Sequence, residues 1–172
     1  RNELVVDQYT TFCWPKTIPA NAYTGATFWN IESKTTMADG RLSSITIVQH
    51  EGDLEAGVPY IMYNEATELK VYQTDDEVLA PAAEDAANGL VGVFVTTMFD
   101  DEFGQVADDA EAATRGIYII SDGTLYLCGN YCGVYANRAY IKNSLIGTVP
   151  GPISAPRRYI GNPNGTPTNL NG

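Results

Sequence analysis

The chain has 172 residues and a mass of 18.6 kDa, and its 21 acidic against 10 basic side chains give a formal net charge of −11 at pH 7. A hydrophobic fraction of 44% with 18% charged residues is typical of a globular protein, and no apolar run approaches the roughly 18 residues of a membrane-spanning helix. The composition therefore argues against disorder and membrane spanning, and the scattered basic residues argue against nucleic-acid binding, which requires a clustered basic surface.

Short apolar runs rich in Val, Ile, Thr, Tyr and Phe follow one another along the chain, separated by Gly, Pro, Asn and Asp. This pattern is typical of β-strands joined by turns. It predicts strands over residues 3–6, 9–14, 26–31, 42–49, 58–63, 69–73, 90–96, 116–120, 124–128 and 133–141. In the run 68–73, Leu69 and Val71 share one face opposite Lys70, as in a strand with one solvent-exposed face.

The strongest local prediction is a hairpin around Asp122 and Gly123. These two residue types suit the positive φ angles of a type I′ turn. The resulting register pairs Ile120 with Leu125, one residue outside the turn on each side. By the same register, Ile119 is opposite Tyr126.

Helical signals are sparse. Residues 81–89 begin with Pro, carry acids early and end in Asn-Gly, which favours one or two helical turns, with a loop as the alternative. The acidic segment 99–114 is interpreted as an exposed excursion. About ten short strands without strand–helix alternation predict an all-β fold with at most one short helix, a two-sheet antiparallel β-sandwich first and a closed β-barrel second.

The two ends of the chain suggest its domain organisation. A single β-sandwich domain is expected over residues 1–160, and the turn-forming, polar residues 161–172 are expected to be a linker or tail. The chain begins at Arg1 without an initiator Met or an export leader, which indicates a piece of a longer protein.

The three cysteines, Cys13, Cys128 and Cys132, leave one unpaired and do not make a disulfide framework. A three-residue hairpin loop over 129–131 would set Cys128 opposite Cys132, whereas a two-residue turn would set it opposite Tyr131. Free thiols are the favoured interpretation.

Catalytic and metal-binding signals are weak. His50 is the only histidine, no Gly-x-Ser-x-Gly elbow is present, and the position of His50 after a predicted strand indicates a surface residue at a strand end. The cysteine spacing does not match a structural zinc site. The acids of 99–114 offer oxygen ligands for calcium but not the EF-hand spacing, so a solvated loop is favoured. No catalytic residue, cofactor or metal is predicted.

The aromatic residues are the most suggestive feature, with two Trp, eleven Tyr and five Phe. Flat exposed rings would allow a β-sheet lectin to stack on sugars, although packing in the core explains aromatic residues in strands equally well. Trp14 and Trp29 lie near predicted strand or loop ends. They are the two predicted ligand-binding residues.

Several motifs occur in order along most of the chain: GATFWNI at 25–31, LEAGVPYI at 54–61, GLVG at 89–92 and NRAYI at 137–141, with Arg157-Arg158-Tyr159 before the polar tail. Together they resemble a β-rich domain found near the C-terminal end of many Bacteroidetes cell-surface proteins, including large leucine-rich-repeat surface proteins. Two features depart from that pattern, the Cys13-Trp14-Pro15 sequence and the pair Cys128 and Cys132. Within the NRAYI motif, Arg138 is expected to pair with an acid or with backbone carbonyls across the sheet.

The resemblance implies an extracellular or cell-surface bacterial protein in which this module is a spacer, a structural unit or an adhesive unit, and it brings no catalytic residues. The expected function is a non-enzymatic structural or adhesive module, and the alternative is a carbohydrate-binding module that uses exposed aromatic side chains. Expected partners are a host or cell-surface protein or glycan and other domains of the same chain, with no nucleic acid and no direct membrane insertion.

Overall fold

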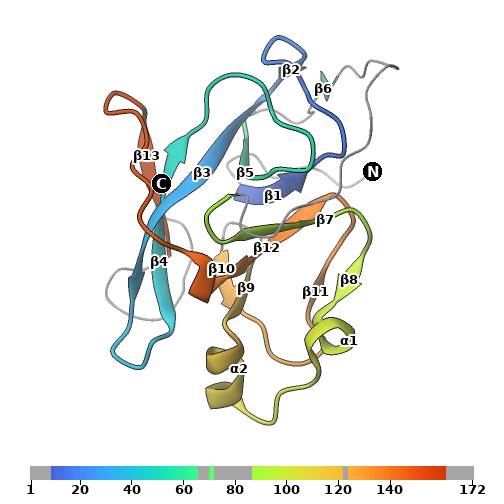
Figure 1. Ribbon diagram of the computed structural model, residues 1–172, viewed down its shortest axis with the longest axis vertical. Coiled ribbons are helices and arrows are strands. Elements are labelled where there is room, and N and C mark those ends of the chain that lie inside the picture. Colours follow the sequence, from blue (N-terminus) through green and yellow to red (C-terminus); the bar gives the residue numbers. More distant parts are fainter. Residues whose placement is uncertain (1–8, 66–69, 72–86, 122–123, 162–172) are drawn as a thin grey trace.

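The computed structural model describes residues 9–65, 70–71, 87–121 and 124–161, which form antiparallel sheets that are not closed into a barrel (Figure 1). The predicted all-β fold is confirmed, and of the two predicted architectures the barrel is wrong. The predicted strand 3–6, most of the predicted strand 69–73, residues 81–86 of the predicted helix and the predicted tail from residue 162 onward lie outside the described residues.

A five-stranded sheet runs along the left of Figure 1 in the order β1-β5-β3-β4-β13. Its strands are β1 (Tyr9–Cys13), β5 (Pro59–Asn64), β3 (Ala26–Thr36), β4 (Leu42–Gln49) and β13 (Arg157–Gly161). The predictions for β1, β4 and β5 agree with these bounds to within one residue. β3 is longer than predicted because it continues past an irregularity at Glu32, between Ile31 and Ser33. β13 was not predicted, because two arginines precede its single aliphatic residue.

A four-stranded sheet packs against the first in the order β10-β9-β12-β7. Its strands are β10 (Thr124–Leu127), β9 (Ile117–Ser121), β12 (Arg138–Lys142) and β7 (Leu90–Val93). The pairs Ile120 with Leu125 and Ile119 with Tyr126 confirm the predicted hairpin register.

Two small ribbons complete the strands. β8 (Thr97–Met98) pairs with β11 (Gly133–Val134), and β2 (Tyr23–Thr24) pairs with β6 (Lys70–Val71). The predicted strand 133–141 is therefore divided into β11 and β12. Asn137 lies between them with a φ of 64°, in the left-handed region that interrupts a strand.

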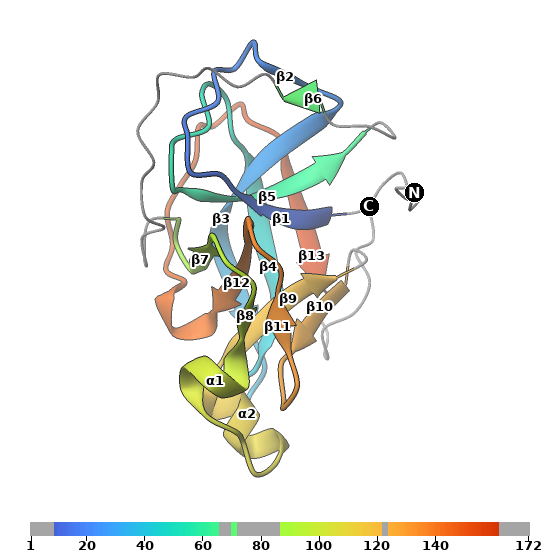
Figure 2. The same cartoon turned by 90° about the vertical axis from the view of Figure 1, so that its right-hand side faces the viewer.

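The expectation of at most one short helix and of an irregular acidic excursion is wrong. The acidic segment forms α1 (Phe99–Phe103) and α2 (Asp109–Arg115), both at one end of the molecule (Figures 1 and 2), and a 3-10 helix, η1, covers Asn143–Leu145. α2 begins where the Asp108 side chain accepts a hydrogen bond from Glu111 N, and it ends at Gly116, whose φ is 70°. None of the helices among the described residues has the length and hydropathy needed to cross a membrane.

The apolar side chains form three clusters. The central core fills the space between the two sheets and includes Trp29, Ile47, Tyr118 and Ile141. The first outer cluster lies on the far face of the five-stranded sheet, where residues from the loops 14–22 and 50–58 cover Phe28 and its neighbours. The second outer cluster lies on the far face of the four-stranded sheet, beneath α1 and the β8–β11 ribbon.

Candidate functional site

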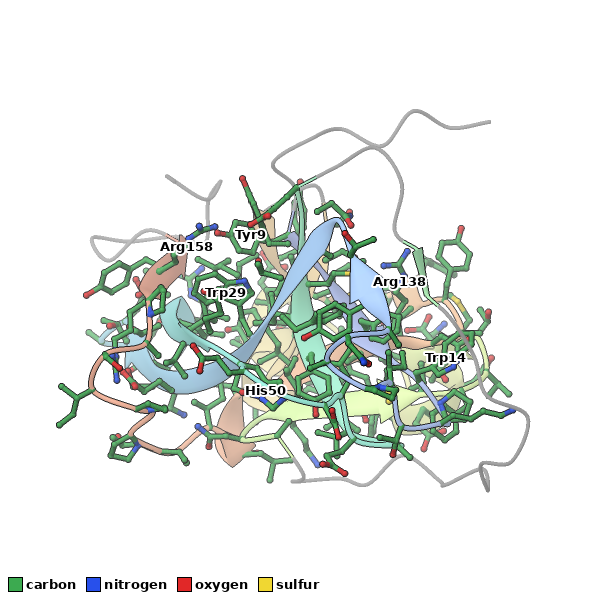
Figure 3. The ribbon with its side chains drawn as sticks, turned by 90° about the horizontal axis from the view of Figure 1, so that it is seen from above. Tyr9, Trp14, Trp29, His50, Arg138 and Arg158 are labelled. Carbon is green, nitrogen blue, oxygen red and sulfur yellow. A yellow bond between two sulfur atoms is a disulfide. The ribbon has the colours of Figure 1, made fainter. Side chains whose placement is uncertain are left out.

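The two predicted ligand-binding tryptophans lie apart, and Trp29 is wrongly predicted (Figure 3). Trp29 is completely buried in the central core, and its Nε1 donates a hydrogen bond of 2.9 Å to Thr27 Oγ1. A ligand therefore has no access to its ring. Trp14 is half-buried and stacks on Phe12 with ring centroids 6.0 Å apart. Its position in the first outer cluster explains it as packing.

Arg158 closes one end of the central core with its guanidinium group. The group lies 4.7 Å from the ring centroid of Trp29 and 4.8 Å from that of Tyr63, and Nη1 donates a 2.6 Å hydrogen bond to Tyr9 Oη (Figure 3). That hydrogen bond raises the pKa of Arg158. These cation–π contacts fasten β13 to the core, so Arg158 has a structural role.

Arg138 connects the two sheets. Its Nη1 donates hydrogen bonds of 3.0 Å to Thr11 O and to Thr10 Oγ1, both on β1. The expectation that Arg138 pairs with backbone carbonyls is confirmed. Burial lowers the pKa of the guanidinium group, and the backbone contact indicates a structural role for this residue as well.

His50 directly follows β4, as predicted, and is half-buried. Its Nε2 lies 2.8 Å from Asp53 O, and its ring centroid lies 4.8 Å from that of Tyr60. Within the described part of the chain, no group of three or more His, Cys, Asp or Glu residues is arranged to hold a metal ion.

Cys128 and Cys132 form a disulfide, so the interpretation of these two residues as free thiols is wrong. β10 ends at Leu127, and the left-handed φ of 61° at Tyr131 turns the chain back, which leaves the two Cα atoms 5.7 Å apart. Cys13 is a free, buried thiol whose Sγ contacts Gly57 O at 3.5 Å. Burial raises the pKa of Cys13 to about 12.

Several exposed large side chains belong to the β8–β11 ribbon, α1 and the loops beside them, and these elements lie toward the viewer in Figure 2. We call this group the tyrosine surface, and it consists of Val95, Met98, Phe103, Tyr131 and Tyr135. Tyr131 and Tyr135 have 83% and 78% of their surface exposed. Tyrosine and methionine are enriched in protein interfaces, and such a group of exposed side chains is the feature expected of a binding surface.

The loop that carries Tyr131 is held in place at several points. The Asn130 side chain makes two hydrogen bonds of 2.8 Å with the backbone N and O of Val106. Tyr131 N donates to Asp100 Oδ2 at 3.1 Å, and Cys132 O accepts from Phe99 N at 3.0 Å. Together with the disulfide, these contacts preorganise the loop, which reduces the entropy lost on binding.

The ribbon beneath the exposed rings is closely packed. Phe99 is completely buried, and its ring centroid lies 4.9 Å from that of Tyr140 on β12. Gly133 pairs with Met98, and a Cβ atom at Gly133 would lie 2.4 Å from Thr97 O. Only glycine allows the two strands to approach this closely at this position.

Sequence reasoning missed Tyr131 and Tyr135 because they are two of eleven tyrosines. A local signal was present: both residues lie within the Gly129–Asn137 region, where the strand pattern is broken by Gly, Asn and Cys. A tyrosine outside a regular apolar alternation has no strand face to bury its ring.

Comparisons with known proteins found no match among family models, curated proteins or solved structures.

Proposed function

We propose that this chain is a non-enzymatic adhesive module of an exported or surface-attached bacterial protein, and that the tyrosine surface contacts its partner. The observation that carries the proposal is the exposure of Tyr131, on the loop closed by the disulfide, and of Tyr135, directly after β11. Aromatic side chains held in one geometry are the residues that contribute most to binding energy at protein interfaces. The partner is a host or cell-surface protein, reached while other domains of the same protein supply attachment.

A second candidate function rests on the same residues. Tyrosine rings present flat faces that stack on sugars, so the tyrosine surface also supports a carbohydrate-binding module whose ligand is a cell-surface glycan. In this form, the alternative uses Tyr131 and Tyr135 in place of the buried Trp29.

The test is adhesion of beads coated with the 172-residue chain to mammalian and bacterial cells. The double variant Tyr131→Ser/Tyr135→Ser is expected to reduce adhesion at least tenfold, since losing two interface tyrosines removes several kcal/mol of binding free energy. Tyr159→Ser is the matched control, because Tyr159 is also exposed but lies on β13, at the opposite side of Figure 1.

The outcomes separate the two candidates. Adhesion that survives periodate oxidation of the cell-surface glycans but not protease treatment supports a protein partner. Adhesion that is lost on periodate oxidation supports the carbohydrate-binding function. Equal adhesion of the double variant and the control, with both variants folded by circular dichroism, contradicts a role for the tyrosine surface.

A further inference from the structure

A segment of the chain crosses the outer face of the five-stranded sheet on its way to β13. We call residues 146–156 the crossing strap. Val149 N donates to Glu32 O at 2.9 Å on β3, and Pro156 O accepts from Gln49 N at 3.0 Å on β4. Between these points Gly151 packs directly on Val48, where a Cβ atom would lie 2.7 Å from Cγ2. The crossing strap therefore lies flat against β3 and β4.

Charged and polar side chains hold the crossing strap at both ends. Arg157 donates to the Glu32 carboxylate from Nε at 2.9 Å and from Nη2 at 2.7 Å, and the same carboxylate accepts from Gly151 N at 2.9 Å. At the other end, the Asn88 side chain donates to Ile31 O and exchanges two hydrogen bonds with Gly147. The polar groups of Glu32 and Asn88 are thus used to fix the strap.

A groove of about 680 Å³ lies beside the crossing strap, bounded by the middle of β3, the end of β4 and residues 87–88 and 144–145. Asn30, Gln49, His50 and Glu51 line its sheet side, and Figure 3 shows His50 at the end of β4. The side chains of Asn30, Gln49 and Glu51 make no hydrogen bond with any described residue, in contrast to Glu32 and Asn88. A rigid groove with unpaired polar side chains has the character of a ligand site, and its volume lies in the range of small-molecule sites.

The chemistry of the lining selects the ligand class. The amides of Asn30 and Gln49 both donate and accept hydrogen bonds, and the Glu51 carboxylate accepts them. Val149, which is 54% exposed, offers an apolar surface on the strap side. No Lys or Arg occurs among the described residues that line the groove, and the chain carries a net charge of −11, so an anionic ligand is disfavoured.

We propose that this groove binds a neutral saccharide. Sugar hydroxyl groups act as donors and acceptors at once, which matches the amides and the carboxylate, and the C–H face of a pyranose ring matches the apolar strap side. The site is separate from the tyrosine surface, because it lies over β3 and β4, whereas the ribbon of the tyrosine surface lies at the other side of the molecule (Figure 1). The inference therefore goes beyond the proposed adhesive surface.

The experiment is a screen of the 172-residue chain on an array of neutral oligosaccharides built from glucose, galactose, mannose and N-acetylglucosamine. Hits are titrated by NMR, with the backbone amides of residues 30, 49–51 and 149 as reporters. Asn30→Ala and Gln49→Ala are each expected to weaken binding about tenfold, since each removes a hydrogen-bonding side chain. Tyr131→Ser/Tyr135→Ser and Glu102→Gln, an exposed acid on α1, are expected to bind as the unmodified chain does.

Three results overturn the proposal. One is the absence of binding to every oligosaccharide on the array by a chain shown to be folded. Another is a bound saccharide whose affinity and amide shifts are unchanged in Asn30→Ala and Gln49→Ala. The third is binding that is lost in the tyrosine double variant and kept in the groove variants, which would assign the glycan to the tyrosine surface. Failure of the adhesion experiment alone leaves the groove result intact, so the two proposals are judged separately.

Discussion

The outer faces of the two sheets are both covered by other segments, but the aromatic side chains in the two covered regions are buried to different extents. On the five-stranded sheet, Phe12, Phe28 and Tyr60 are buried beneath two loops. On the four-stranded sheet, the cover buries Phe99 but leaves the tyrosine surface exposed. Tyr140 of the four-stranded sheet is buried as well, so the exposed rings belong to the cover of that sheet and not to the sheet itself.

The two covers are built differently. On the five-stranded sheet, the loops 14–22 and 50–58 bind each other through paired backbone hydrogen bonds of 2.9 and 2.8 Å between Ile18 and Leu54, and both side chains are buried. On the four-stranded sheet, α1 inserts Phe99, and the disulfide loop is fixed to α1 by its backbone. The first cover is held by backbone pairing and apolar packing, whereas the second is fixed by polar and covalent links and carries exposed rings on its own residues. Exposure of an aromatic residue is therefore a property of the cover.

The comparison predicts equal stability losses but different effects on adhesion for the central phenylalanine of each outer cluster. Phe28→Ala and Phe99→Ala are each expected to lower the free energy of unfolding by about 3–5 kcal/mol, because each removes a fully buried ring. Only Phe99→Ala is expected to reduce adhesion as well, since α1 and the disulfide loop depend on that ring. Urea unfolding and the bead assay measure the two effects.

Tyr159→Ala is the control for this pair, because Tyr159 is 59% exposed and lies outside the tyrosine surface, so its removal is expected to cost about 1 kcal/mol or less and to leave adhesion unchanged. The comparison fails if Phe28→Ala reduces adhesion as much as Phe99→Ala does under conditions where both remain folded.

A smaller effect is expected from removing the disulfide. The loop closed by Cys128 and Cys132 is short, and the chain-entropy relation gives about 2 kcal/mol of stabilisation for a loop of this length. Cys128→Ser/Cys132→Ser is expected to increase hydrogen exchange in residues 99–106 and 128–134 but not in 14–22 or 50–58. Equal loss of protection on both sides would show that the two covers are coupled.

The chain offers an internal control for that experiment. Because burial raises the pKa of Cys13 to about 12, its thiol remains protonated and unreactive at neutral pH in the folded protein. Reductant should therefore reproduce the double variant, and alkylation of the reduced, folded chain should label the partly buried Cys132 but not Cys13.

The smallest expected effect is a loss of stability at acidic pH. Hydrogen bonds from Arg157 and from Gly151 N lower the pKa of Glu32, so its contribution to stability is present above the ordinary glutamate pKa and is lost as the pH falls through the lower, folded value. Between about pH 5 and pH 3 the melting temperature of the unmodified chain should fall more than that of Glu32→Gln. A parallel decline of the two curves would contradict the role given to this ion pair. As the pH is lowered, hydrogen exchange should increase in the crossing strap before it increases in the disulfide loop.

The sequence was most informative where a strand is bounded by turn-forming residues. β4 was predicted with both ends correct, because the run from Leu42 to Gln49 is rich in β-branched residues and lies between Gly40 and Gly52, and the hairpin register followed from Asp122-Gly123. β13 was missed because one of its two inward residues, Arg158, is charged and is accommodated by three aromatic rings, while Ile160 is the other. No local pattern contains that information, since Tyr9, Trp29 and Tyr63 come from three other strands.

The helices and the candidate site show a second limit. α2 has a recognisable signal in Asp108 and Glu111, which resemble a capping box: the Glu111 side chain also accepts from Ala107 N at 3.0 Å. The many acidic residues of this segment led to its interpretation as an exposed excursion, so this helix-capping signal was overlooked. For the tyrosine surface and the groove, the determining contacts join residues far apart in the chain, such as Glu32 with Arg157 and Tyr131 with Asp100. Those contacts determine which aromatic rings and amide side chains remain exposed. Composition alone therefore could not distinguish the exposed ones from the buried ones.

The position of β13 late in the chain also affects how the chain folds. β4 pairs with β3 early in the sequence, but its other edge is completed only by β13, after the whole four-stranded sheet has been made. Until residues 157–161 arrive, the chain presents an open strand edge beside Ile45 and Ile47. Such an edge is a template for pairing with another chain. A nascent or truncated chain that lacks β13 is therefore expected to aggregate through β4. By pairing with β4, β13 protects this edge of the five-stranded sheet from other chains.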